Sequence, residues 1–233
     1  VLVSVCGSAV LQSTAHRVPG AFPGLAPWPV RPNPGGMVTQ TLVAAGVEGL
    51  AVPSPAEFEM IARLAPTAAM HYNNPVRARH EIDYAVGMGV KSYSVDSRSE
   101  LAKLIELVPA EGTEISVRFK LPVAGAAYNF GAKFGATVEV AAELLRAVEA
   151  AGFIPSLTFH PGTQCTDPMA WDAYIRAAAE ICRLAGVKAR RLNTGGGFPA
   201  HRVEGELPAL EAIFALIARV ADEAFDGAPP ALV

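Results

Sequence analysis

The sequence predicts an α/β fold in which eight parallel strands alternate with helices around a closed (β/α)8 barrel. Short runs with the composition of strands alternate with helical patterns along the whole chain, an order that requires parallel strands and right-handed crossovers. Eight such units can be counted. No GxGxxG motif follows the first strand, which disfavours an open dinucleotide-binding sheet.

The predicted strands are short runs spread along the chain. They span 26–31, 48–52, 68–72, 91–96, 114–120, 155–160 and 189–193, and an eighth begins at Ala231. The first is unusual because Pro27, Pro29 and Pro32 remove backbone donors from a strand that a barrel pairs on both sides.

Caps and periodicity mark the predicted helices. Residues 54–57 (Ser-Pro-Ala-Glu) form a capping box with proline at the first helical position, and this box opens a helix that runs through Arg63. Further helices are predicted over 97–107, 137–151, 171–185 and 207–225. Gly152 and Gly186 follow two of them, as C-terminal caps do.

Composition bounds the class of protein. Of 233 residues, 51% are hydrophobic and 18% are charged, which predicts one large folded domain. The net charge of −3 gives no electrostatic case for binding nucleic acid or an anionic membrane, and no apolar stretch approaches the ~20 residues of a membrane span. Three cysteines without a CxxC pair fit free thiols in a reducing compartment, so we expect a cytoplasmic protein. No metal site is predicted.

Several polar residues fall at the ends of predicted strands, where barrel enzymes place their chemistry. They are Arg31, Tyr72, Asp96, Arg118, His160 and Asn193. Asp96, followed by Ser97, has a second interpretation as the cap of the next helix. By contrast, His71, His80 and the basic runs 77–80 and 188–191 are expected at solvated edges.

Three consecutive glycines, Gly195 to Gly197, follow the seventh predicted strand. Backbone without side chains can adopt positive φ and wrap an anion, so this loop is either a phosphate site or a tight turn.

These segments together resemble the fold-type III pyridoxal-phosphate-dependent decarboxylases, the ornithine, diaminopimelate and arginine decarboxylase group. The resemblance covers nearly all of residues 22–233. Its motifs are, in order, Pro29-Val30-Arg31-Pro32-Asn33-Pro34, Ala51-Val52-Pro53-Ser54, Tyr72-Asn73-Asn74-Pro75, Ser94-Val95-Asp96-Ser97, Arg118, Lys133-Phe134-Gly135, Phe159-His160-Pro161-Gly162-Thr163-Gln164 and Asn193-Thr194-Gly195-Gly196-Gly197-Phe198-Pro199.

The resemblance implies a barrel of the alanine racemase type, pyridoxal 5′-phosphate as cofactor, and lyase activity on ornithine, lysine, arginine or diaminopimelate in polyamine or amino-acid metabolism. His160 would lie flat against the pyridine ring. Thr163 and the amides of Gly195, Gly196 and Gly197 would hold the phosphate, and Arg118 would point toward the ring substituents.

Two positions depart from the family pattern. Arg31 stands where the family has the lysine that carries the cofactor as a Schiff base, and a guanidinium is too poor a nucleophile to replace it. Ala51 stands where the family usually has an aspartate beside the cofactor. Lys133 does not occupy the Schiff-base position. We therefore expect non-covalent cofactor binding, if the cofactor binds, and a large fall in rate.

The resemblance also predicts the domain organisation. Residues 1–233 would form the cofactor-binding barrel, with 1–21 as a lead-in segment and Val233 at the start of the eighth strand. A Glu-Pro-Gly-Arg segment and a C-terminal β-domain would follow, in a homodimer. The chain is therefore expected to be a fragment, with its barrel truncated at the eighth strand and the β-domain absent.

Three alternatives remain open at this point. The chain could be a non-catalytic homologue that binds the cofactor or a partner subunit, which Arg31 and Ala51 favour. It could be a barrel enzyme on a phosphorylated metabolite without pyridoxal phosphate, although paired carboxylates at the strand ends are missing. It could also be an inactive fragment.

Overall fold

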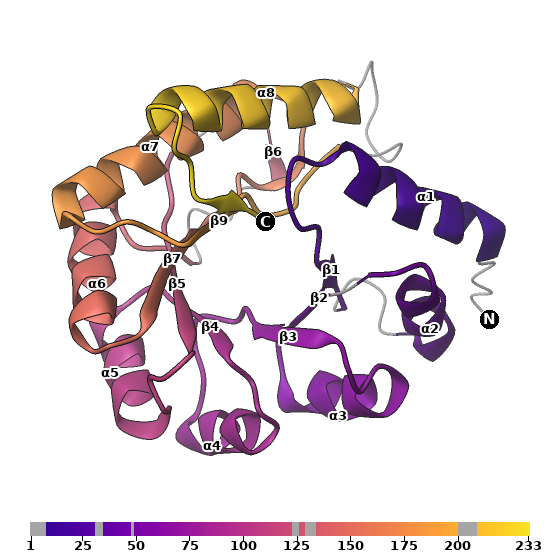
Figure 1. Ribbon diagram of the computed structural model, residues 1–233, viewed down its shortest axis with the longest axis horizontal. Helices are drawn as coiled ribbons and strands as arrows, with labels where there is room; N and C mark the ends of the chain where they lie inside the picture. Colours follow the sequence, from indigo (N-terminus) through magenta and orange to yellow (C-terminus); the bar gives the residue numbers. More distant parts are fainter. Residues whose placement is uncertain (1–7, 31–34, 48, 123–125, 129–133, 200–208) are drawn as a thin grey trace.

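The computed structural model describes residues 8–30, 35–47, 49–122, 126–128, 134–199 and 209–233. Its centre is an eight-stranded sheet in the order β1-β2-β3-β4-β5-β7-β9-β10, in which every neighbouring pair is parallel. The strands surround the middle of the molecule and the helices form an outer layer (Figure 1). The predicted barrel is confirmed. Its strands are β1 (Trp28–Pro29), β2 (Gly49–Val52), β3 (Ala69–Tyr72), β4 (Ser92–Val95), β5 (Glu114–Arg118), β7 (Ile154–Thr158), β9 (Arg191–Asn193) and β10 (Ala231–Leu232).

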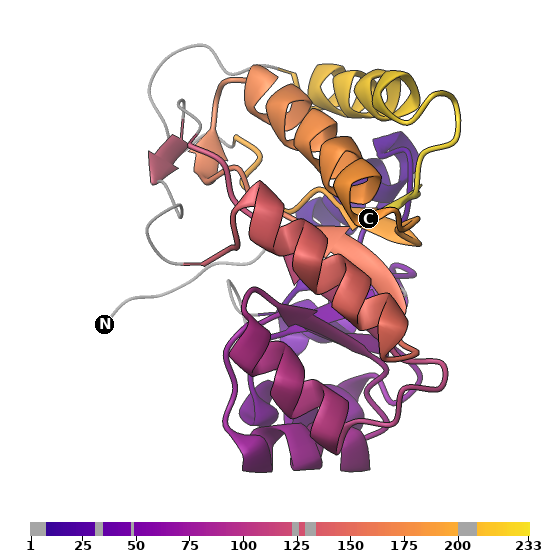
Figure 2. The ribbon, with the colours of Figure 1, turned by 90° about the vertical axis from the view of Figure 1, so that its left-hand side faces the viewer.

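All five predicted helices are present, and three helices were not predicted. The outer layer consists of α1 (Ser8–Ala21), α2 (Gly36–Ala44), α3 (Pro55–Leu64), α4 (Arg79–Gly87), α5 (Arg98–Leu107), α6 (Val138–Ala150), α7 (Met169–Ala185) and α8 (Leu210–Ala224). Helices α1, α2 and α4 are the unpredicted ones. Seen from the side, α6 and α7 lie next to each other on the outside of the sheet (Figure 2). A separate antiparallel pair, β6 (Ala126–Tyr128) and β8 (Thr163–Cys165), was not predicted either.

The strands alternate between an apolar outer face and a polar inner face. On β4, Tyr93 is buried and packs beside the ring of Tyr72, while Ser92 lines a cavity within the barrel. On β5, Glu114 and Ser116 line the same cavity. Apolar burial is thus concentrated between strands and helices, where it supplies most of the stabilisation.

The first strand is the least regular of the eight. Only Trp28 and Pro29 form ladder pairs, with Leu50 and Ala51. Proline at 27 and 29 leaves no N–H to donate, and the next donor along is Val30, whose N–H reaches the carbonyl of Ala51 at 3.1 Å. Of the described residues of the predicted strand 26–31, only Trp28 and Pro29 are therefore in β1.

The seam between β1 and β10 is joined outside the ladder. The N–H of Leu25 donates to the carbonyl of Leu232 at 3.1 Å, just before β1 begins. The backbone approach is so close that a Cβ on Gly24 would lie 2.1 Å from the Leu232 oxygen. On the outer side, the rings of Phe22 and Phe214 meet edge to face with centroids 5.2 Å apart. Among the described residues, no helix is long and apolar enough to cross a membrane.

Candidate functional site

A cavity of about 100 Å³ opens at the carboxyl ends of the first strands of the barrel. Pro29 and Ala51 line it from β1 and β2, and Arg118 lines it from the end of β5. The other lining residues are Pro53, Asn73, Asn74, Pro75 and Phe134. We call this space the Arg118 cavity, because Arg118 is the only charged side chain among the described residues that line it.

Arg118 lines this cavity with a guanidinium that is largely shielded from water. Burial lowers the pKa of its guanidinium, and the carboxylate of Asp96 partly offsets that effect. The guanidinium carbon lies 5.5 Å from the centre of the Phe134 ring. Within the described parts of the chain, Arg118 makes no ion pair, so its charge is available to an anionic ligand.

His160 is positioned directly after β7 by the turn that follows it. Its Nδ1 accepts the N–H of Gly162 at 3.0 Å, which leaves the proton of the neutral ring on Nε2. Burial, assisted by the charge of Arg118, lowers the pKa of His160 from 6.5 to about 4. The ring is therefore an uncharged aromatic surface at neutral pH.

The glycine loop packs directly against this histidine turn. Gly195 and Gly197 have φ values of +70° and +86°, and a Cβ on Gly197 would lie 2.0 Å from the Gly162 carbonyl oxygen and 3.0 Å from Cε1 of His160. The N–H of Cys165 also donates to the Gly197 carbonyl at 2.7 Å. Only glycine fits at position 197. Thr163 is exposed and lies in the chain between Gly162 and Cys165, the two residues that contact Gly197.

The backbone N–H groups of the glycine loop differ in whether they already donate a hydrogen bond. The N–H of Gly195 donates to Oδ1 of Asn193 at 2.8 Å. For Gly196 and Gly197 no acceptor is found in the described part of the chain, and a Cβ on Gly196 would meet nothing closer than Nε2 of His160 at 3.8 Å. A cradle of this shape, beside a neutral imidazole, fits a phosphate ester.

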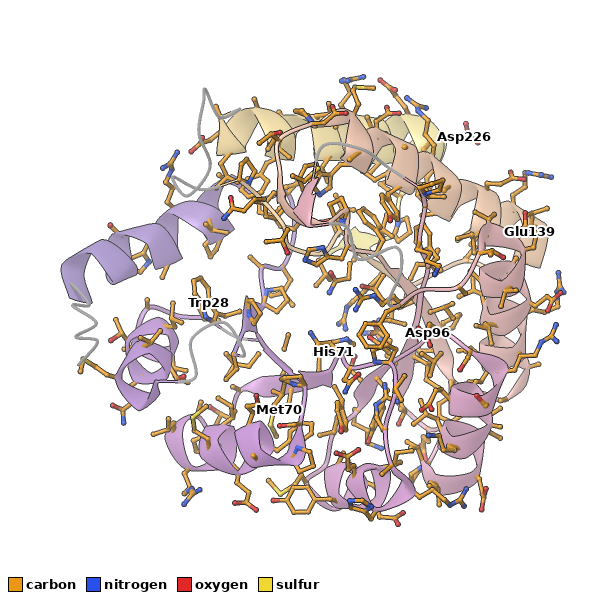
Figure 3. All side chains as sticks on the ribbon, turned by 180° about the vertical axis from the view of Figure 1, so that it is seen from behind. Trp28, Met70, His71, Asp96, Glu139 and Asp226 are labelled. Carbon is orange, nitrogen blue, oxygen red and sulfur yellow. The ribbon has the colours of Figure 1, made fainter. Side chains whose placement is uncertain are left out.

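Asp96 does not cap the following helix. The cap of α5 is Ser97, whose Oγ accepts the N–H of Glu100 at 3.3 Å. Asp96 instead accepts the N–H of Gly135 at 3.0 Å through Oδ2. In Figure 3, Asp96 and His71 lie toward the middle of the barrel, whereas Glu139 and Asp226 lie at its periphery.

The structure brings most of the predicted site residues to one end of the barrel. Ala51 and Arg118 share one cavity, and Arg118 acts electrostatically on His160, which contacts the glycine loop. Arg31 and Lys133 lie outside the described residues, so the predicted replacement of the Schiff-base lysine stays a prediction.

Three sequence expectations about polar residues were wrong. Tyr72 does not enter the site: its ring is buried on the outer face of β3 against Phe58, and burial raises its pKa to about 12. Arg77 is 3% exposed rather than solvated, and its guanidinium lies 4.8 Å from the Tyr72 ring centre. Exposed Arg79 and His80 agree with the expectation for that run.

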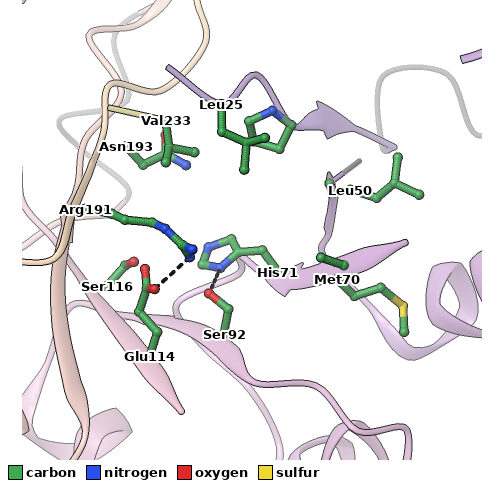
Figure 4. Close-up of a pocket in the computed structure, with 13 residues that line it drawn as sticks. Leu25, Leu50, Met70, His71, Ser92, Glu114, Ser116, Arg191, Asn193 and Val233 are labelled. Atoms are coloured by element: carbon green, nitrogen blue, oxygen red, sulfur yellow. Dashed lines mark hydrogen bonds and ion pairs between the residues drawn. The ribbon is translucent and has the colours of Figure 1, made fainter. Parts of the chain in front are cut away.

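The third wrong expectation concerns His71, which lines a second cavity of about 90 Å³ inside the barrel, nearer the amino ends of the strands (Figure 4). Arg191 lines it too, but its side chain is 37% exposed, and Lys188 and Arg190 are exposed as expected for that run. His71 forms hydrogen bonds through Nδ1 with Ser92 at 2.6 Å and through Nε2 with Ser94 at 3.0 Å. Arg191 pairs with Glu114 at 2.8 Å. These groups satisfy one another, which makes the cluster structural. Polar residues at alternate positions, Ser92 and Ser94 on β4 and Glu114 and Ser116 on β5, are the sequence signal for such a polar interior.

Comparison with known proteins identifies the family of this chain. The family model described as pyridoxal-dependent decarboxylase, pyridoxal binding domain, matches residues 10–233. The lysine/ornithine decarboxylase of Selenomonas ruminantium is 30% identical over 179 residues, covering 75% of this chain and 45% of that protein. The ornithine decarboxylase of Mus musculus is 30% identical over 185 residues, covering 77% of this chain and 40% of that protein.

A solved structure gives the same result at the level of the fold. A mutant of SrLDC in complex with PLP superimposes with a TM-score of 0.84 at 25% identity, covering 96% of this chain and 59% of that one. The chain spans less than half the length of the two curated relatives above. Because the family model matches nearly the whole sequence, this chain belongs to the pyridoxal-dependent decarboxylases and corresponds to their pyridoxal binding domain.

Proposed function

We propose that this chain binds pyridoxal 5′-phosphate at the carboxyl ends of its barrel strands, as part of a decarboxylase acting on ornithine, lysine, arginine or diaminopimelate. The observation that carries the proposal is the contact between the glycine loop and the turn that carries His160, with Arg118 close enough to act on that histidine. The match to the family's pyridoxal binding domain and the PLP complex among the similar structures support it.

Each residue has a role that its surroundings favour. The N–H groups of Gly196 and Gly197, with the hydroxyl of Thr163, would hold the phosphate. Gly195 contributes its left-handed backbone, since its own N–H donates to Asn193. Neutral His160 would stack on the pyridine ring, and Arg118 would face the ring substituents. The cofactor supplies an electron sink for the pair left behind when a carboxylate leaves as CO₂.

Arg31 sets the mode of attachment in this proposal. A guanidinium stays protonated at any physiological pH and does not condense with an aldehyde, so the cofactor would be held without a covalent bond. The variant Arg31→Lys tests this. It should acquire cofactor that borohydride fixes to the peptide containing residue 31, while the wild-type protein should not. If the variant gains no fixed cofactor, the assignment of residue 31 to the cofactor site fails.

A non-catalytic homologue that binds the cofactor or a partner subunit is the second candidate. The pair Arg31 and Ala51 favours it, because both replace ionisable groups that the family uses at the cofactor. CO₂ release from the four amino acids, measured for the full-length wild-type protein and its Arg31→Lys variant, distinguishes the candidates. Release by the variant alone indicates a decarboxylase pocket that has lost its covalent anchor, and release by neither indicates a binding protein.

A homodimer for the full-length form and a cytoplasmic location complete the proposal. The described thiols Cys165 and Cys182 are free, which is consistent with a reducing compartment. Sedimentation of the full-length protein checks the dimer.

A further inference from the structure

Asp96 carries an inference that rests on the proposed function and extends it to a residue without an assigned role. Its carboxylate neither caps α5 nor forms an ion pair among the described residues, but accepts the N–H of Gly135 at 3.0 Å. Gly135 lies 39 positions later in the sequence. The contact therefore joins the end of β4 to a remote segment, 134–136.

The opposite side of this segment is bound to the end of β5. The N–H of Ala136 donates to the carbonyl of Arg118 at 2.9 Å, and the N–H of Lys120 donates to the carbonyl of Ala136 at 3.0 Å. Gly135 has a φ of +112°, and a Cβ there would lie 2.9 Å from the carbonyl carbon of Phe119. The segment thus lies across the ends of β4 and β5, with Asp96 as its side-chain anchor.

Phe134 connects the anchored segment 134–136 to the Arg118 cavity. Its ring lines the Arg118 cavity and lies 5.5 Å from the guanidinium carbon of Arg118. A cation at this distance from an aromatic face is attracted by the ring quadrupole, so the Phe134 ring favours the observed position of the guanidinium. Displacing segment 134–136 would move the Phe134 ring, and the Arg118 guanidinium that faces the ligand would lose this aromatic contact.

We propose that Asp96 is a positioning residue: by accepting the Gly135 N–H, it holds segment 134–136 across the strand ends and so keeps Phe134 against the Arg118 guanidinium that receives pyridoxal phosphate. The same carboxylate acts on Arg118 through space and partly offsets the effect of burial on its pKa.

Two substitutions separate the hydrogen bond from the charge. Asp96→Asn keeps an oxygen that can accept the Gly135 N–H, and Asp96→Ala removes it. Asp83→Ala, which removes an exposed carboxylate from α4, is the matched control. Exchange of the Gly135 amide with deuterium, followed by NMR on the cofactor-free protein, should be about tenfold faster in Asp96→Ala and close to wild type in the other two, since a tenfold change corresponds to about 1.4 kcal/mol, within the range of one hydrogen bond to a carboxylate.

A second measurement, the Kd for pyridoxal phosphate from absorbance titration, should follow the same order. We expect about tenfold weaker binding for Asp96→Ala and near wild-type binding for Asp96→Asn and Asp83→Ala. Equal Gly135 exchange in wild type and Asp96→Ala overturns the inference. Faster Gly135 exchange in Asp96→Ala, together with an unchanged Kd for pyridoxal phosphate, also overturns the inference. If wild type shows no saturable binding, the proposed function fails, and the exchange measurement alone decides whether Asp96 anchors the segment.

Discussion

His160 and His71 are both partly buried imidazoles whose pKa values are lowered to about 4, but their neighbours differ. His71 has both ring nitrogens occupied by the serines of β4. His160 has Nδ1 occupied by the backbone of its own turn and its Nε2 edge beside Gly196. The first histidine therefore holds strands together, whereas the second presents a defined edge and an uncharged face to the candidate site.

The tautomer of His160 follows from this contact. Because Nδ1 accepts a backbone N–H, the proton of the neutral ring is on Nε2. ¹⁵N chemical shifts of the ring at pH 7 should report this tautomer. A ring protonated at Nδ1, or at both nitrogens, would be incompatible with the observed turn.

Acid should destabilise the fold through His71. Its pKa is lowered from 6.5 to about 4 by burial and by the charges of Arg77 and Arg191. Since the folded-state pKa lies below the unfolded-state value, the stability contributed by the neutral ring is complete above pH 6.5 and is lost as the pH falls toward 4. The loss amounts to about 3 kcal/mol.

Urea unfolding at pH 7 and pH 4.5 measures this effect. The variant His71→Leu should show a shallower fall in unfolding free energy between the two pH values than wild type. Parallel falls in both proteins would mean that other groups cause the acid sensitivity.

At the scale of elements, the glycine loop requires glycine at positions 195 and 197 but tolerates another residue at position 196. We expect Gly197→Ala to lower the unfolding free energy by at least about 2 kcal/mol, because the new Cβ meets backbone and the φ is left-handed. Gly196→Ala, which has open space and no positive φ, should cost less than about 1 kcal/mol. Denaturant unfolding of the two variants checks this, and equal costs would contradict the described loop.

The sequence predicted elements well where periodicity and caps were strong, as in α3 and α6, and failed where tertiary contacts decide. Helix α2 starts without a side-chain cap and contains β-branched residues, so no local signal marks it. Helix α4 was not predicted because it begins in a run of charged residues, although Ile82 and Ala85 form its buried face. The pair β6–β8 has three residues per strand and forms only because two distant loops meet.

The same distinction applies to the site. His160, Arg118 and the glycines could be predicted because strand ends and glycine runs are local features. The anchoring of segment 134–136 by Asp96 and the pairing of Glu114 with Arg191 could not, because each joins residues far apart in the chain. Burial of Arg77 depends on the rings of Tyr72 and Tyr93, which come from two different strands.

At the scale of the whole molecule, closure of the barrel depends on apolar contact across the seam between β1 and β10. Phe22, buried against Phe214, carries much of this contact, whereas Arg17 and Glu211 form an exposed ion pair over the same seam. We expect Phe22→Ala to lower the unfolding free energy by about 3 kcal/mol and Arg17→Ala by less than about 1 kcal/mol. Urea unfolding compares them. If the arginine variant loses as much as the phenylalanine variant, the seam is held by charge and not by packing.

We propose that the barrel binds pyridoxal phosphate without a covalent bond. An absorbance titration of the wild-type protein with pyridoxal phosphate, followed by borohydride treatment and dialysis, tests this mode of binding. We expect saturable binding that is lost on dialysis, with no cofactor fixed to any peptide. Absence of saturable binding, or cofactor fixed by borohydride to a lysine, would contradict it.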